Sequence, residues 1–180
     1  MTVLEKISNV AVIIAALCVG GTAVYSRIGS PSVSAGSDFG SRYKGKPIPL
    51  AGYQKGVPSV LIFASRACHF CSESLPFYQR LATMRDSAPG TMRLVSAFPT
   101  SAQSAEETRK YFSDGGVVLD DALPARFPFI GVRGTPTVAL VDSGGNVSAV
   151  WTGKLSPDGE AGLMREVKSL CPACKVAGTS

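Results

Sequence analysis

Two cysteines separated by two residues, Cys68 and Cys71, are the part of this 180-residue chain whose type and spacing point most directly to chemistry. Thiols at this spacing can meet as a disulfide within one helical turn, as in a dithiol redox centre. An apolar run, 57–64, precedes them and a helix-like segment, 72–84, follows them. Cys68 is therefore expected at a helix N-terminus, where free N–H groups and the helix dipole favour the thiolate that attacks disulfides.

Three ionisable side chains near the pair are candidates for modulating it. His69, as imidazolium, would stabilise the Cys68 thiolate; the alternative is a neutral, exposed histidine with little effect. Arg66 is a second cationic candidate, although such an arginine is more often simply exposed. Glu73 is a candidate for handling the proton of Cys71, and the alternative is a solvated glutamate on an early helical turn.

A second pair with the same spacing, Cys171 and Cys174, lies near the end of the chain, and Cys18 lies in an apolar N-terminal run. The helix that begins at Pro157 is expected to end near Leu170. Cys171 would then sit at the negative end of the helix dipole, which disfavours a thiolate. We expect a second disulfide in a C-terminal segment, 171–180, with either a structural role or an accessory role in exchange.

The elements that must position these residues alternate along the chain. Apolar runs predict strands at 57–65, 92–98, 137–141 and 147–151, the last two joined by a hairpin turn at 142–146. Helices are predicted at 72–88, 105–112 and from Pro157, with Ser156 as N-cap. Pro76 falls inside the first helix and should kink it. This order predicts an α/β fold in which helices flank a mixed sheet.

Several features together resemble the thioredoxin superfamily, and especially its membrane-anchored branch of TlpA/ResA-like thiol-disulfide oxidoreductases. The resemblance covers about 46–170. The residues that carry it are Phe63, Cys68, Cys71, Pro76, the run Gly134-Thr135-Pro136-Thr137, Asp142, Gly145 and Gly153. It implies a thioredoxin-like fold without a cofactor or metal.

The resemblance also implies roles for the Gly134–Thr137 loop. Pro136 would be cis and would face Cys68, and the Thr135 backbone would bind an extended substrate segment as a short added strand. Two positions depart from the family. Ala67 stands where the family usually has Trp, and Ile62 stands where it often has a buried Asp or Asn.

Composition limits the other classes of function. The chain carries a net charge of +5, but its basic residues are scattered and no basic block contains interleaved aromatics, so we expect no nucleic-acid partner. A copper-delivery or metal-binding thioredoxin-like chaperone is the alternative to an oxidoreductase. That chemistry favours a wider cysteine spacing and a distant histidine, whereas the only histidine here is His69.

The N-terminal residues predict a membrane anchor. No charge occurs between Ile7 and Ser26, a length close to the shortest that spans a bilayer, so 1–26 is expected to be a transmembrane helix. A Gly/Ser-rich tether, 27–45, would join it to the thioredoxin-like domain, 46–170. The alternative is a signal peptide cleaved after 33–35.

These expectations combine into one hypothesis. The chain would be a single-pass protein of the inner membrane, with a periplasmic or otherwise extracytoplasmic domain. It would exchange disulfides with protein substrates through Cys68 and Cys71 in the reductase direction, and a membrane electron donor would recycle it. The oxidase direction stays open, because direction depends on the redox potential and the electron donor. Apocytochrome thiols, a copper-site protein and a general pool of exported proteins all stay open as substrates.

Overall fold

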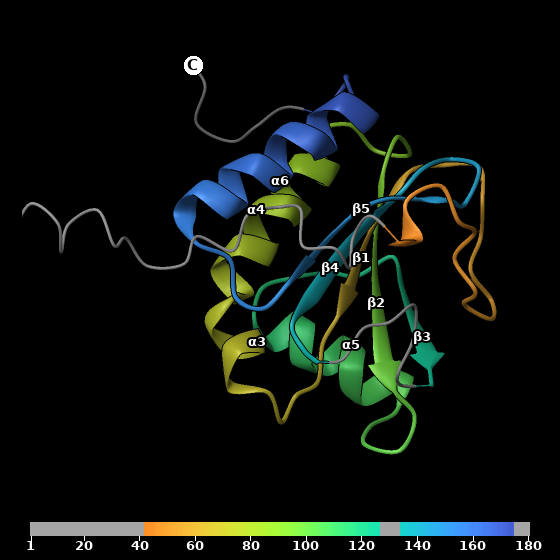
Figure 1. Cartoon of the computed structure of the whole chain (residues 1–180). Helices are drawn as coiled ribbons and strands as arrows, with labels where there is room; N and C mark the ends of the chain where they lie inside the picture. Colours follow the sequence, from red (N-terminus) through yellow and green to blue (C-terminus); the bar gives the residue numbers. More distant parts are fainter. Residues whose placement is uncertain (1–41, 127–133, 175–180) are drawn as a thin grey trace, which may run out of the picture. The chain divides into compact units, whose positions relative to one another are not determined.

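A mixed sheet forms the centre of the protein. The computed structural model describes residues 42–126 and 134–174, within one compact unit of the chain, 33–180. The five strands are ordered β3-β2-β1-β4-β5 (Figure 1). They are β1 (Ser59–Phe63), β2 (Arg93–Pro99), β3 (Asp121–Ala125), β4 (Thr137–Val141) and β5 (Val147–Thr152). Strands β1, β2 and β3 are parallel, whereas β4 and β5 are antiparallel, so the predicted mixed sheet is confirmed.

The apolar run that precedes the cysteines forms the central strand, β1, and every residue of it is buried. Val60 and Ile62 face one core, while Leu61 and Phe63 face the other. This explains the nearly continuous apolar sequence, because a strand covered on both faces has no solvent side. Full burial of a side chain of this size stabilises the fold by about 1.5–3 kcal/mol.

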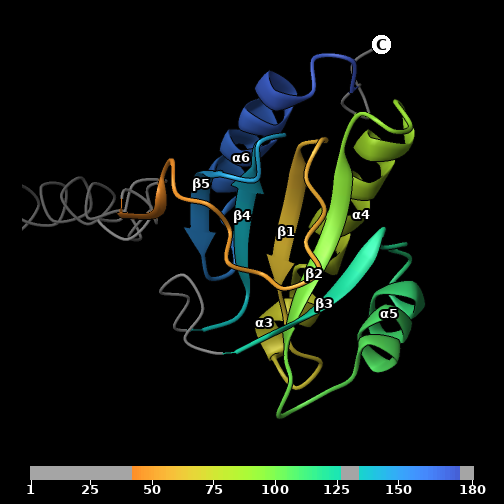
Figure 2. The same ribbon diagram turned by 90° about the vertical axis from the view of Figure 1, so that its right-hand side faces the viewer.

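Helices cover the Val60 side of the sheet. They are α3 (His69–Glu73), α4 (Leu75–Asp86), α5 (Ala105–Asp114) and α6 (Pro157–Leu170). Each of the three longer helices packs a side chain into this core: Tyr78 from α4, Phe112 from α5 and Leu163 from α6. The segment before β1, orange in Figure 2, covers the other face with Ile48 and Leu50.

The helix after β1 differs in part from the prediction. We expected one helix over 72–88 with a kink at Pro76; an interruption is present next to this proline, but it divides the segment into two helices, α3 and α4. The helix begins earlier, at His69, and breaks at Ser74, whose N–H and hydroxyl both donate to the Phe70 carbonyl. Pro76 then lies in the first turn of α4, where the missing N–H costs no helical hydrogen bond.

The sequence also gave no sign of strand β3. Its residues include Asp121 and Pro124, which are uncommon in strands. Pairing on one side alone, at the edge of the sheet, makes Pro124 tolerable. The segment before β1, 46–50, forms a single antiparallel bridge, Pro47 to Asn146, and no full strand.

An ion pair between the buried Arg85 and the partly exposed Asp120 links α4 to the sheet. The Arg85 side chain is only 10% exposed, and its Nη1 donates to Asp120 Oδ2 at 3.0 Å. The same carboxylate oxygen accepts the N–H of Leu94 on β2 at 2.6 Å. Asp120 therefore satisfies a cation and a strand N–H at once.

The predicted transmembrane segment, 1–26, and most of the predicted tether, 27–45, lie outside the described residues. Within 42–126 and 134–174, none of the helices has the length and apolar character needed to cross a membrane.

Candidate active site

Cys68 lies at the end of the connection between the central strand, β1, and helix α3. It is the N-cap of α3, and its Sγ accepts the N–H of Cys71 at 3.3 Å. The same sulfur donates to the Thr135 carbonyl at 3.2 Å. Cys68 is partly exposed and Cys71 is buried, and both are free thiols. The predicted location of Cys68 at a helix N-terminus is thus confirmed.

Cys71 is held mainly as a thiol by its surroundings. Its residue has no exposed surface. Burial, aided by the hydrogen bond with Cys68, raises the pKa of the Cys71 thiol to about 12. The arrangement gives one accessible sulfur and one protected sulfur behind it.

The loop before β4 supplies the wall next to Cys68. The Thr135–Pro136 peptide bond is cis, as expected. The Pro136 carbonyl accepts the N–H of Gly153 at 2.7 Å, and the Thr137 hydroxyl donates to the Gly134 carbonyl at 2.9 Å. These bonds fix the Thr135 backbone beside the Cys68 sulfur, so the predicted juxtaposition of the loop and the cysteine is confirmed.

The three proposed modulators face carboxylates and cations on the surface. The Arg66 guanidinium pairs with Glu107 at 3.0 Å, and His69 Nε2 lies 3.1 Å from a Glu73 oxygen. The other Glu73 oxygen accepts from Lys154 Nζ at 2.9 Å. The hydrogen bond from Lys154 is the main cause that lowers the pKa of Glu73. A carboxylate held in its charged form is a weaker proton acceptor, so this geometry favours the solvated alternative for Glu73.

Two aromatic side chains near the dithiol were not singled out from the sequence. Tyr78 is buried under the site, and burial, followed by the nearby Cys71, raises its pKa. Phe70 lies between the cysteines and is 55% exposed. Tyr78 follows the helical spacing of a core residue, so the sequence carried no separate signal for it.

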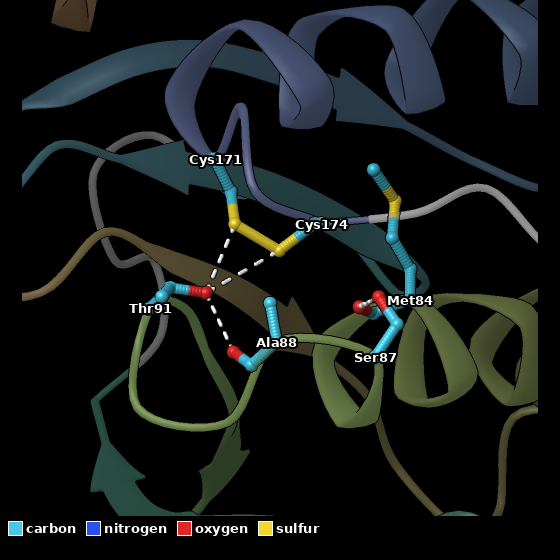
Figure 3. Close-up of a disulfide and its surroundings, with 6 residues drawn as sticks. All are labelled: Met84, Ser87, Ala88, Thr91, Cys171 and Cys174. Carbon is cyan, nitrogen blue, oxygen red and sulfur yellow. Dashed lines mark hydrogen bonds between the residues drawn. A yellow bond between two sulfur atoms is a disulfide. The ribbon is translucent and has the colours of Figure 1, made fainter.

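The second cysteine pair forms a disulfide, as expected. Cys171 and Cys174 are bonded and almost fully buried. Figure 3 shows both sulfurs over the turn between α4 and β2, where Thr91 Oγ1 lies 3.1 Å from Cys171 Sγ and 3.6 Å from Cys174 Sγ. The Thr91 hydroxyl donates to the Ala88 carbonyl at 2.6 Å. The disulfide therefore belongs to the core rather than to an exposed end.

The two cysteine pairs lie at opposite ends of the sheet. Cys68 follows the carboxyl end of β1, whereas Leu170, next to Cys171, lines a small hollow beside Pro58 and Met92, which precede β1 and β2. Helix α6 connects the two ends, and its 14 residues span about 21 Å. The disulfide is therefore too far from Cys68 for direct exchange within this structure.

The part of the chain that the structure describes holds no cluster of potential metal ligands. No group of three or more His, Cys, Asp or Glu side chains is placed there to hold a metal ion.

Comparison with known proteins identifies the fold. No protein-family model matches the sequence, and the search of curated proteins finds no match either. Among solved structures, the chain is similar to a Chlorobium tepidum protein described as the thiol:disulfide interchange protein DsbE, with a TM-score of 0.52 and 17% identity over 65% of this chain and 82% of that one.

Two further structures agree. One is a thiol-disulfide isomerase from Corynebacterium glutamicum, with a TM-score of 0.51 and 15% identity over 69% of this chain and 92% of that one. The other, from Bacteroides thetaiotaomicron, is described as a protein disulfide isomerase, with a TM-score of 0.53 and 14% identity over 66% and 76% of the two chains. The chain therefore has a thioredoxin-like fold, as its sequence predicted.

Proposed function

We propose that this protein is a thiol-disulfide oxidoreductase that uses Cys68 as its nucleophile and Cys71 as its resolving cysteine. One observation carries the proposal: the partly exposed Cys68 sulfur lies at a helix N-cap, 3.2 Å from the Thr135 carbonyl, with the buried Cys71 behind it. This asymmetry suits an attacking thiolate and a second thiol that is shielded until it is needed.

The reaction follows from this geometry. A substrate segment docks against the backbone of Thr135 as a short added strand. The Cys68 thiolate attacks one sulfur of the substrate disulfide, so a mixed disulfide forms and the other substrate sulfur leaves as a thiolate that takes up a proton. Cys71 loses its proton and attacks Cys68 Sγ, which releases the second substrate thiol. The substrate has then gained two electrons, and the protein holds a Cys68–Cys71 disulfide.

We assign the reductase direction on the pairing of the neighbouring charges. A strongly oxidising site stabilises its reduced form, usually through positive groups beside the thiolate. Here the two nearest basic side chains in sequence, Arg66 and His69, each lie against a carboxylate. A dithiol carried by a membrane protein would return two electrons to the Cys68–Cys71 disulfide after each cycle.

The cellular setting is proposed from the sequence alone. The uncharged residues 7–26 would anchor the chain in the inner membrane, and the Gly/Ser-rich tether would hold the domain on the extracytoplasmic side. The resemblance to the TlpA/ResA-like branch supports the same setting. The substrates would be exported proteins that carry disulfides.

Steady-state turnover tests the activity. The protein, kept reduced by a small dithiol, is mixed with a disulfide-bonded protein substrate, and the appearance of substrate thiols is followed. Cys68→Ser should abolish turnover, and Cys71→Ser should stop it after one substrate is captured. The double variant Cys171→Ala/Cys174→Ala is the matched control and should retain turnover. Equal rates for the wild type and Cys68→Ser would overturn the proposal.

A further inference from the structure

The turn that carries Cys68 has one backbone N–H that its own hydrogen bonds leave unused. The Cys68 N–H donates to the Ser65 carbonyl at 3.0 Å, which closes a four-residue turn from 65 to 68. The Ala67 N–H donates to Ser65 Oγ at 3.3 Å. The Arg66 N–H takes part in neither contact. It is therefore the group through which another segment can hold this turn.

Gln103 takes that position from a different loop. It lies between β2 and α5, and its Oε1 accepts the Arg66 N–H at 2.9 Å across 37 residues of sequence. Its Nε2 donates to Thr108 Oγ1 at 2.7 Å, and that hydroxyl donates to the Ser104 carbonyl at 2.7 Å. Gln103 and Thr108 are both buried. The amide is thus fixed at both ends and cannot turn away without leaving a buried group unpaired.

A second contact joins the same two loops, but it is weaker. The Arg66 guanidinium pairs with Glu107 at 3.0 Å, and both side chains are about half exposed. Glu107 also closes a capping box with Ser104 at the start of α5. An exposed ion pair of this kind contributes little to stability, because solvent screens it. The buried amide, rather than the charge pair, is the firm connection between α5 and the Cys68 turn.

We propose that Gln103 is a positioning residue for the nucleophile, an inference that rests on the proposed function. By holding the Arg66 N–H, Gln103 fixes the turn that ends at Cys68, and so fixes the Cys68 sulfur against the Thr135 carbonyl. The docking backbone belongs to another loop, so loss of Gln103 should leave substrate binding intact. It should slow the attack step, because small displacements of a reacting atom are costly in rate.

Gln79 offers a matched control. It is a glutamine whose Nε2 donates to a backbone carbonyl, that of Gly115, at 2.8 Å, and it ties the other end of α5 to α4. Gln79→Met and Gln103→Met both replace an amide with an apolar side chain of similar length. Only the second loses a bond to the Cys68 turn.

The test is the separation of kcat from KM in disulfide reduction, together with an unfolding curve for each variant. Gln103→Met should lower kcat by about tenfold at an unchanged KM, the size expected from one lost backbone hydrogen bond that positions the nucleophile. Thr108→Val, which frees Nε2, should give a smaller decrease. Gln103→Glu retains an oxygen acceptor for the Arg66 N–H and should recover most of the lost kcat. Gln79→Met should leave both constants unchanged.

Each other result has a defined meaning. A folded Gln103→Met variant with wild-type kcat would overturn the inference, as would a loss of kcat that Gln79→Met shares. If Gln103→Met does not fold, Thr108→Val and Gln103→Glu decide on the same criterion. Absence of turnover in the wild type would instead count against the proposed function. The test of positioning would then be the rate at which iodoacetamide alkylates Cys68. This rate should change in Gln103→Met and stay constant in Gln79→Met.

Discussion

The protonation of Cys71 gives the sharpest quantitative prediction. Burial, aided by the hydrogen bond with Cys68, raises the pKa of Cys71 from 9.0 to about 12. At about 1.4 kcal/mol for each pKa unit, the site favours the thiol by about 4 kcal/mol. At pH 8 the thiolate fraction of Cys71 would be about a thousandfold below that of an ordinary thiol.

The assay is alkylation of Cys71 as a function of pH in Cys68→Ala, with the modified peptide identified by mass spectrometry. The variant removes the smaller cause, the Cys68 hydrogen bond, and leaves burial in place. The midpoint should therefore remain above 9.0, and in denaturant it should fall back to an ordinary thiol value. A midpoint at or below 9.0 in the folded variant would refute the argument that burial protects the resolving cysteine.

The same shift predicts how stability depends on pH. Because the folded-state pKa of Cys71 lies above the unfolded value, its contribution is complete below about pH 9 and is lost as the pH rises towards about 12. The reduced protein should lose up to about 4 kcal/mol of stability across this window. Cys71→Ala should lack that component in urea unfolding curves collected at each pH.

Two sets of substitutions and one fractionation have further expected outcomes. Replacing Cys171 and Cys174 by alanine should lower the free energy of unfolding by about 2 kcal/mol, because the closed loop is short, and should preserve turnover; a loss of turnover equal to that of Cys68→Ser would show an obligatory relay. Asp120→Ala should cost about 1–2 kcal/mol in urea unfolding, since it removes the acceptor of the Leu94 N–H and one of the two carboxylates that pair with Arg85, whereas the exposed Asp114→Ala should change the free energy by less than about 0.5 kcal/mol. The full chain should stay with membranes after an alkaline wash through 7–26, and a soluble product that begins near Gly36 would show cleavage instead.

The order of strands and helices could largely be predicted because each element carried its own local signal. The run at β1 is apolar throughout, Ser156 and Pro157 mark the start of α6, and the turn before β5 has hairpin residues. β3 escaped because Pro124 and the neighbouring acidic residues conceal a strand that pairs at a sheet edge. The exact position of the break, at Ser74, could not be predicted, because Pro76 indicates only that the helix is interrupted close to it.

The site was predictable where it rests on spacing and not where it rests on contacts through space. The dithiol and the Pro136 loop are visible in sequence, and the structure brings them together. The partners of Arg66 and His69 are not visible in the sequence, since each of these side chains could face either the Cys68 sulfur or a carboxylate. Gln103 is the clearest case, because nothing in its sequence neighbourhood indicates that it reaches Arg66 from another loop.

Direct capture of the mixed disulfide tests the central claim. Reduced Cys71→Ala is mixed with a disulfide-bonded peptide, quenched with acid and digested for mass spectrometry. We expect a covalent adduct on Cys68, and in wild type the same reaction should proceed to a Cys68–Cys71 disulfide with release of both peptide thiols. An adduct confined to Cys171 or Cys174 would contradict this mechanism. Reduction of the peptide disulfide without any adduct would contradict it as well.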